Sequence, residues 1–164
     1  MNKFSITFTC LCCLFIAKNM VAQPQMDTLE VKADVQNTVQ KLFDAMRNND
    51  SATLHTIFTA KARLLSVESE KGNMQVFETS IADFITAVGQ PKNEVWNEVI
   101  WSYSIELNNE IASVWCPYTF FLEQNGHKQL LHCGVNSIEL YRSNDGWQIT
   151  QITDTRSETG CREN

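Results

Sequence analysis

Apolar side chains first follow a helical spacing. Between residues 27 and 48 they recur at intervals of three and four, at Val35, Val39, Leu42, Phe43 and Met46. This spacing places them on one side of a helix of 3.6 residues per turn, so the segment is predicted as an amphipathic helix that packs on a core.

Capping residues predict two shorter helices. Asp50 or Ser51 is suited to begin a second helix directly after the first. Ser80, followed three residues later by Asp83, has the form of a capping box with Asp in place of Glu. We therefore expect a third helix that starts there and ends near Gly89.

The rest of the chain has the pattern of strands and turns. The β-favouring runs 62–69 and 74–79 flank a turn-rich tetrad, residues 70–73. Four longer runs follow, separated by turns that include an Asn-Gly and an Asp-Gly pair, which favour hairpins: residues 95–107, 111–123, 128–142 and 146–156. The sequence predicts an antiparallel meander, and helices that precede their main sheet indicate an α+β fold with the helices packed on one sheet face.

Strand parity gives part of the orientation of the side chains. With a two-residue turn at residues 125–126, Tyr118 lies opposite Cys133, and His132 falls on the other face. Apolar positions change from odd to even numbers within residues 134–137, which predicts a bulge there. Since a bulge changes the register, parity leaves the face of His132 open.

Residues 1–22 have the organisation of a secretory signal peptide. Lys3 supplies a positive start, residues 4–17 are mostly apolar, and Ala22 offers a small residue for cleavage. An uncleaved membrane anchor is the alternative, but a spanning helix needs about 20 apolar residues. We expect an exported protein, periplasmic or extracellular, with no stable membrane anchor after cleavage and a single domain over residues 23–164.

Composition and charge narrow the class of protein. The 164 residues are 43% hydrophobic, with three Pro, which indicates one packed domain. Net charge is −6 and becomes −8 without residues 1–22, which hold two Lys and no acid. Because the basic residues are scattered, nucleic acid is not an expected partner.

Three of the six cysteines lie inside the apolar N-terminal run. The other three, Cys116, Cys133 and Cys161, have no zinc or iron–sulfur spacing, so no metal site is predicted. In an exported chain an odd number indicates one disulfide and one free thiol. Cys133 with Cys161 is the preferred pair, because it would staple the C-terminal tail, and three buried reduced thiols remain the alternative.

The order of elements and four C-terminal segments carry a family resemblance. The segments are residues 114–120 (VWCPYTF), 132–136 (HCGVN), 146–149 (GWQI) and 154–156 (DTR), with Cys161 after them. The chain resembles the nuclear transport factor 2-like (NTF2-like) superfamily, which includes SnoaL-like polyketide cyclases. It is most similar to exported bacterial members of uncharacterised activity, some of which are described as lumazine-binding. The resemblance implies a strongly curved sheet wrapped around helices into a cone with a pocket, and it implies no single reaction.

Two residues are candidates for catalysis. His132 can act as a general acid or base near neutral pH, and Asp154 could orient it. The alternative for His132 is a structural strand position. Asp154 and Arg156 could bind a polar or anionic ligand, or they could form an ion pair that holds the last strand.

Other candidates would line the pocket. Tyr118 could donate a hydrogen bond to an oxyanion, but isomerase chemistry of that kind also needs a base and a second acid, and only Asp154 is evident. The ligand-pocket candidates are Trp115, Tyr118, His132, Asn136, Asp154 and Arg156. The tryptophans Trp96, Trp101, Trp115 and Trp147 could form an aromatic wall, although aromatic strand residues are more often core.

Three classes of function follow. The first is a pocket protein that binds a small aromatic or polar-headed molecule. The second is an isomerase, dehydratase or cyclase of the SnoaL type, which would need His132 and Asp154 in one cavity. The third is a non-catalytic interaction protein, a homodimer through its exposed sheet face. No cofactor is predicted.

Overall fold

The computed structural model describes residues 28–162, so the expected signal peptide at residues 1–22 lies outside the described residues. The helices are α1 (Thr28–Asn48), α2 (Ser51–Ile57) and α3 (Ile81–Gly89). The strands are β1 (Phe58–Glu70), β2 (Asn73–Ser80), β3 (Val95–Ile100), β4 (Ser104–Asn108), β5 (Ile111–Gln124), β6 (His127–Ser143) and β7 (Gly146–Thr155). None of the helices in this range is long and apolar enough to cross a membrane.

The three predicted helices form with the predicted caps. The Asp50 carboxylate accepts a hydrogen bond from the backbone N–H of Thr53 at 3.0 Å, and Ser80 accepts one from the N–H of Asp83 at 3.1 Å. Each bond satisfies an N–H that a helix leaves unpaired in its first turn. The strand predicted over residues 62–69 begins earlier, because β1 starts at Phe58, directly after α2.

The strands form one seven-stranded sheet in the order β2-β1-β7-β6-β5-β3, and β4 also pairs with β5. The meander β5–β6–β7 is antiparallel as predicted, but β1 and β7 run parallel, so the sheet is mixed. The predicted strand 95–107 is two strands, β3 and β4, separated by residues 101–103. Both strands pair with β5. The break at residues 101–103 therefore lets the segment 95–108 follow the curvature of β5.

A bulge in β6 sets the face of His132. Phe120 pairs with His132, whereas Phe121 pairs with Leu130, so Leu131 is the extra residue. The prediction of a bulge was right in kind but wrong in place, since residues 134–137 pair regularly with β5. The extra residue changes the parity, and His132 joins Tyr118 and Phe120 on one face of the sheet.

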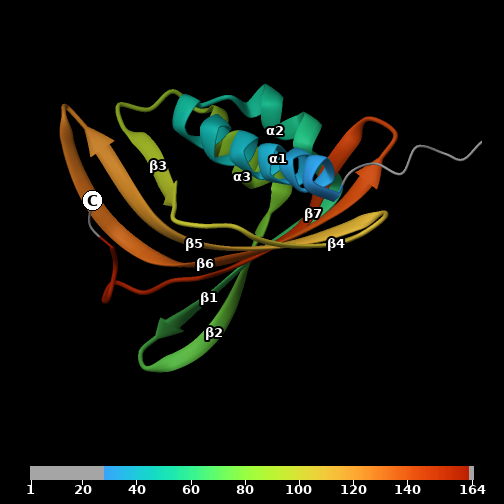
Figure 1. The fold of residues 1–164 in the computed structure, drawn as a ribbon. Helices are drawn as coiled ribbons and strands as arrows, with labels where there is room; N and C mark the ends of the chain where they lie inside the picture. Colours follow the sequence, from blue (N-terminus) through green and yellow to red (C-terminus); the bar gives the residue numbers. More distant parts are fainter. Residues whose placement is uncertain (1–27, 163–164) are drawn as a thin grey trace, which may run out of the picture.

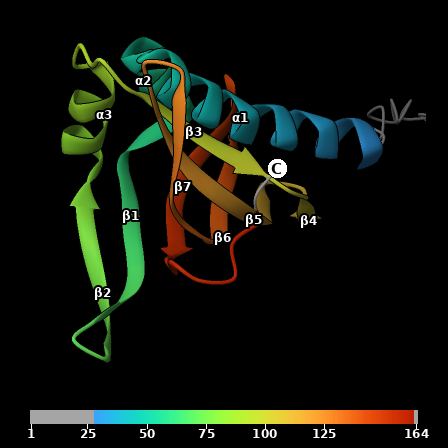
Figure 2. The same ribbon diagram turned by 90° about the vertical axis from the view of Figure 1, so that its left-hand side faces the viewer.

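The sheet curves beneath the helices to form a cone (Figure 1). Its concave face and the helices enclose the core, which includes the fully buried Val35, Leu54, Val114 and Ile149. The β1–β2 hairpin extends beyond the body of the molecule (Figure 2), and every residue of β2 is exposed. These features confirm the α+β cone expected from the resemblance.

A disulfide joins Cys133 in β6 to Cys161 in the C-terminal tail, so this pairing, and not three reduced thiols, is what the structure contains. Backbone hydrogen bonds between Cys133 and Ser157 in both directions, at 2.8 and 2.9 Å, hold the same segment. The third cysteine, Cys116, is free and buried. Burial raises the pKa of its thiol to about 12, which leaves it inert as a nucleophile.

Candidate functional site

The open end of the cone contains a cavity of about 470 Å³. Much of its wall is apolar and comes from α1, α3 and the concave face of the sheet: Leu42, Phe43, Met46, Leu64, Phe84, Trp96, Phe120, Leu122 and Ile152. The polar lining residues come mainly from the sheet. Six of them form two groups that use their hydrogen-bonding atoms differently.

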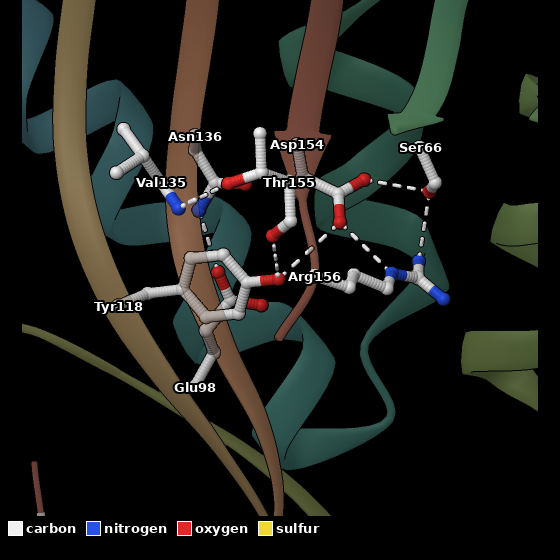
Figure 3. Close-up of polar contacts among 8 residues, drawn as sticks. All are labelled: Ser66, Glu98, Tyr118, Val135, Asn136, Asp154, Thr155 and Arg156. Atoms are coloured by element: carbon white, nitrogen blue, oxygen red, sulfur yellow. Dashed lines mark hydrogen bonds and ion pairs between the residues drawn. The ribbon is translucent and has the colours of Figure 1, made fainter. Parts of the chain in front are cut away.

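The first group, called here the Asp154 cluster, consists of Ser66, Tyr118, Asp154 and Arg156 (Figure 3). Ser66 Oγ donates to Asp154 Oδ1 at 2.6 Å, while Arg156 Nε donates to Asp154 Oδ2 at 2.9 Å. The Tyr118 hydroxyl lies 3.2 Å from the same Oδ2 and 3.0 Å from the carbonyl oxygen of Thr155. Arg156 Nη2 also donates to Ser66 Oγ at 2.9 Å. The cluster is closed, because both carboxylate oxygens are occupied by protein donors.

Gly134 makes this arrangement possible. It pairs with Tyr118 across β5 and β6, and the Thr155 carbonyl lies against its Cα. A side-chain Cβ at position 134 would overlap the backbone of Thr155. A glycine is therefore required for β7 to approach closely enough to accept a hydrogen bond from Tyr118.

The second group is the pair Glu98 and Asn136, on β3 and β6. Both side chains are buried, Glu98 with 9% exposure and Asn136 with 4%. Asn136 Nδ2 donates to Glu98 Oε1 at 2.6 Å (Figure 3). Within residues 28–162, Glu98 Oε2 has neither a hydrogen-bond partner nor an ion pair, and it is not sealed off from solvent. This oxygen is open to the cavity.

Burial acts strongly on the Glu98 carboxyl. The loss of hydration raises its pKa to about 7, against the hydrogen bond from Asn136, which lowers it. The carboxylate of Asp154 adds to the increase and the guanidinium of Arg156 opposes it. Glu98 can therefore hold or release a proton near neutral pH.

His132 lies in the same cavity. Its ring stacks on Phe120 with centroids 5.0 Å apart and meets Tyr118 edge to face at 5.8 Å. Burial and the positive charge of Arg156 lower the pKa of the imidazole, so it is neutral at physiological pH. Among the described residues, the imidazole has no hydrogen-bond partner, and Asp154, whose oxygens are already used, does not orient it.

The structure brings five of the six pocket candidates to the cavity wall, at Tyr118, His132, Asn136, Asp154 and Arg156. Trp115 is the exception: it lies on the opposite face of β5, is 56% exposed and does not line the cavity. Of the four tryptophans, Trp96 lines the cavity. Trp147 is core, the position favoured for strand aromatics, and Trp101 donates to Thr119, so the four do not form one aromatic wall.

Glu98 was missed by the sequence reasoning, which found Asp154 as the only acid. An acid in a strand normally indicates a solvent-facing position, so the residue type did not mark Glu98 as buried. The available signal was parity, since Trp96 and Glu98 share a face with Ile100. Among residues 28–162, no three His, Cys, Asp or Glu side chains gather closely enough to hold a metal ion.

Comparison with known proteins places this site in a family. Residues 30–122 match the family described as “Putative lumazine-binding”, and this segment is more than half of the 164 residues. The chain belongs to this lumazine-binding family. The matched segment includes Ser66, Glu98 and Tyr118 but stops before β6 and β7, which carry His132, Asn136, Asp154 and Arg156. No curated protein matches the chain.

Solved structures share the fold of this lumazine-binding family member at low sequence identity. The β subunit of a putative aromatic-ring-hydroxylating dioxygenase from Novosphingobium aromaticivorans has a TM-score of 0.66 and 12% identity, covering 83% of this chain and 95% of that chain. An NTF2-like protein from Cytophaga hutchinsonii has a TM-score of 0.60 and 16% identity, covering 80% of this chain and 100% of that chain. A Mycobacterium tuberculosis protein of unknown function has a TM-score of 0.65 and 11% identity, covering 83% of this chain and 79% of that chain. The fold is that of the NTF2-like, SnoaL-like superfamily.

Proposed function

We propose that this protein binds a small molecule in the cavity of the cone. The observation that carries the proposal is a cavity of about 470 Å³ with a mostly apolar wall and a few polar groups on one side. Ligand sites in proteins have this character. The description of the lumazine-binding family supports a small-molecule ligand.

The lining indicates the shape of this ligand. Aromatic rings of Phe43, Phe84, Trp96 and Phe120 face the cavity from α1, α3, β3 and β5, and they suit a flat apolar body. Polar atoms left open on the wall, among them those of Glu98 and His132, suit a polar head. The closed Asp154 cluster positions this wall rather than binding the ligand directly.

Calorimetric titration with lumazine and with naphthyl methyl ketone tests the proposal. Ile152→Trp, which fills the cavity, should abolish binding of whichever probe binds. Thr153→Trp is the matched control, because the next residue of β7 points away from the cavity, and this variant should bind as wild type does. A probe at 100 times its Kd should add about 2.7 kcal/mol of stability. Equal binding by both variants would place the ligand elsewhere.

We also propose that the protein is exported, as residues 1–22 predict. The Cys133–Cys161 disulfide supports this, since disulfides persist in oxidising compartments. Intact mass of the protein from a bacterial envelope fraction should correspond to residues 23–164. Recovery of the full-length chain from the cytosol would contradict export.

The second candidate is an enzyme that moves protons, an isomerase, dehydratase or cyclase. Glu98 favours it, because a carboxyl with a pKa of about 7 and one open oxygen is poised to take a proton from a carbon beside a carbonyl and return it. The test is deuterium exchange from heavy water into the methyl group of naphthyl methyl ketone, followed by NMR. Exchange that Glu98→Gln abolishes, with ketone binding retained, supports an enzyme, and exchange at the buffer rate contradicts it.

The open cavity favours a small-molecule protein over a pure interaction protein. The convex sheet face does expose Ile111 and Trp115, and it also carries the partly exposed Tyr141. A homodimer through this face therefore stays a prediction. Light scattering of the purified protein, with Trp115→Ser as the variant, tests it.

A further inference from the structure

We propose that the cavity selects an uncharged ligand that carries a hydrogen-bond acceptor, such as a carbonyl oxygen or a ring nitrogen, and that Glu98 is protonated when this ligand is bound. The inference rests on the proposed function and specifies the chemistry of the ligand. It is carried by the geometry of Glu98, Asn136 and the Asp154 cluster.

The first step is the position of the proton on Glu98. Oε1 accepts a hydrogen bond from Asn136 Nδ2 at 2.6 Å, so a proton on the carboxyl belongs on Oε2. Oε2 is also the oxygen that is open to the cavity. A protonated Glu98 thus directs its O–H at the ligand, and the ligand must supply an acceptor.

The second step is the charge around Glu98. Among the described residues, no cation forms an ion pair with Glu98, and Arg156 is paired with Asp154 at 2.9 Å. The titratable side chains that act on Glu98 or share its cavity wall are Glu94 just before β3, Cys116 and Tyr118 of β5, His132 of β6, Asp154 and Arg156 of β7, and Tyr103 between β3 and β4. Glu94 Oε1 accepts a hydrogen bond from Trp96 Nε1 at 3.0 Å. From α1, the residues that face the cavity are apolar: Leu42, Phe43 and Met46. The only cation among these groups already has a partner.

The third step is what a ligand does on arrival. An uncharged body that covers Oε2 removes water from it, and further desolvation favours the neutral acid over the carboxylate. Because the free protein has a Glu98 pKa of about 7, this stabilisation draws in a proton at pH values above 7. Binding of a neutral acceptor therefore takes up a proton and weakens as pH rises.

Three probes of one shape separate the possible ligand classes: naphthyl methyl ketone, isopropylnaphthalene and naphthylethylamine, substituted at the same ring position. They present an acceptor, no polar group and a cation, respectively. Their Kd values are measured with the mature protein, residues 23–164, and with its variants, between about pH 6 and pH 8. For the ketone, calorimetry in phosphate and in Tris, which differ in ionisation enthalpy, reports the protons taken up.

We expect the ketone to bind best and its Kd to increase about tenfold from pH 6 to pH 8, with proton uptake approaching one per ligand at the upper end. Glu98→Gln mimics the protonated acid, because its amide keeps both an acceptor for Asn136 and a donor for the ligand. This variant should bind the ketone with no pH dependence. Glu98→Leu should lose the preference for the ketone over isopropylnaphthalene.

His132→Gln is the control for the other titratable group at this wall. Burial and Arg156 lower the pKa of His132 from its ordinary 6.5, so the imidazole is mostly neutral in the upper part of the tested range, and this variant should keep the pH dependence there. Equal, pH-independent binding of ketone and hydrocarbon would overturn this inference and leave the proposed function standing. Tightest binding of the amine, strengthening with pH, would overturn it in favour of an ionised Glu98. Failure of all three probes and of lumazine to bind would overturn both.

Discussion

The Asp154 cluster and the Glu98–Asn136 pair lie on the same concave wall, yet they use their polar atoms in opposite ways. Both Asp154 oxygens receive protein hydrogen bonds, and a cation lies 2.9 Å from one of them. Glu98 has one oxygen bound by Asn136 and the other open, with no cation beside it. The protein therefore supplies hydrogen bonds to both carboxylate oxygens of Asp154 but to only one of the two oxygens of Glu98.

This difference separates structural from functional polar groups. A buried polar atom without a partner costs free energy, so a protein keeps such an atom where a ligand or a proton completes it. The Asp154 cluster holds β1, β5 and β7 together. Asn136 positions Glu98 with one oxygen open to the cavity. The four variants below test this division between structural and functional polar groups.

Gly134→Ala should have the largest effect, because its Cβ overlaps the Thr155 backbone and β7 must move away from β5. We expect a loss of more than about 3 kcal/mol in the free energy of unfolding, measured by urea denaturation. Gly126→Ala, in the turn of the same hairpin, has open space and should lose only about 1 kcal/mol through its positive φ. Similar losses for both would show that the approach of Thr155 is not required.

Asp154→Ala should lose about 3 kcal/mol, because it removes the common acceptor of Ser66, Tyr118 and Arg156. The control is Asp44→Ala, which removes an exposed ion pair with Arg47 and should change stability by less than about 0.5 kcal/mol. If the two variants unfold alike, the cluster is not what stabilises the sheet.

Glu98→Gln should remove a pH dependence of stability. The ordinary pKa of 4.5 describes the unfolded chain and the folded value is about 7, so the folded state binds more protons between these values. Wild-type stability should therefore fall by about 2 to 3 kcal/mol from pH 5 to pH 8 through this group alone. Thermal unfolding of the Gln variant should show a slope flatter by this amount. The exposed Glu106→Gln should keep the wild-type slope, and an unchanged slope in Glu98→Gln would contradict a buried carboxyl with no cation beside it.

Tyr118→Phe should have the smallest effect, a loss of about 1 kcal/mol, because it removes one hydroxyl that donates within the closed cluster. The affinity for naphthyl methyl ketone should stay at the wild-type value, since Tyr118 offers its proton to the protein. Tyr141→Phe, which removes an exposed hydrogen bond to Gln148, should leave stability nearly unchanged. A large loss of ketone affinity in Tyr118→Phe would move this hydroxyl from the structural group to the binding group.

Much of the fold could be predicted from local sequence. The spacing of α1, the caps of α2 and α3, and the Asn-Gly and Asp-Gly turns act over a few residues, so the sequence shows them directly. The candidate site was found in part for a similar reason. Tyr118, Asn136 and Asp154 lie in segments whose pattern resembled a known family, and all three line the cavity.

Non-local pairing decided what the sequence did not show. The parallel contact of β1 with β7 joins segments about ninety residues apart, and no local pattern distinguishes it from an antiparallel neighbour. The bulge at Leu131 moved His132 to the cavity, because one extra residue reverses every side chain beyond it.

The amino-acid sequence by itself determined the elements, their order and the family resemblance, because periodicity, capping and turn chemistry depend on neighbouring residues. Only the tertiary structure decided which acid presents an open oxygen to the cavity. An acid in a strand is usually exposed, and the properties of Glu98 come from its burial at the cavity wall and from Asn136, 38 residues away in the chain. A pKa depends on the surroundings in space, which sequence distance does not measure.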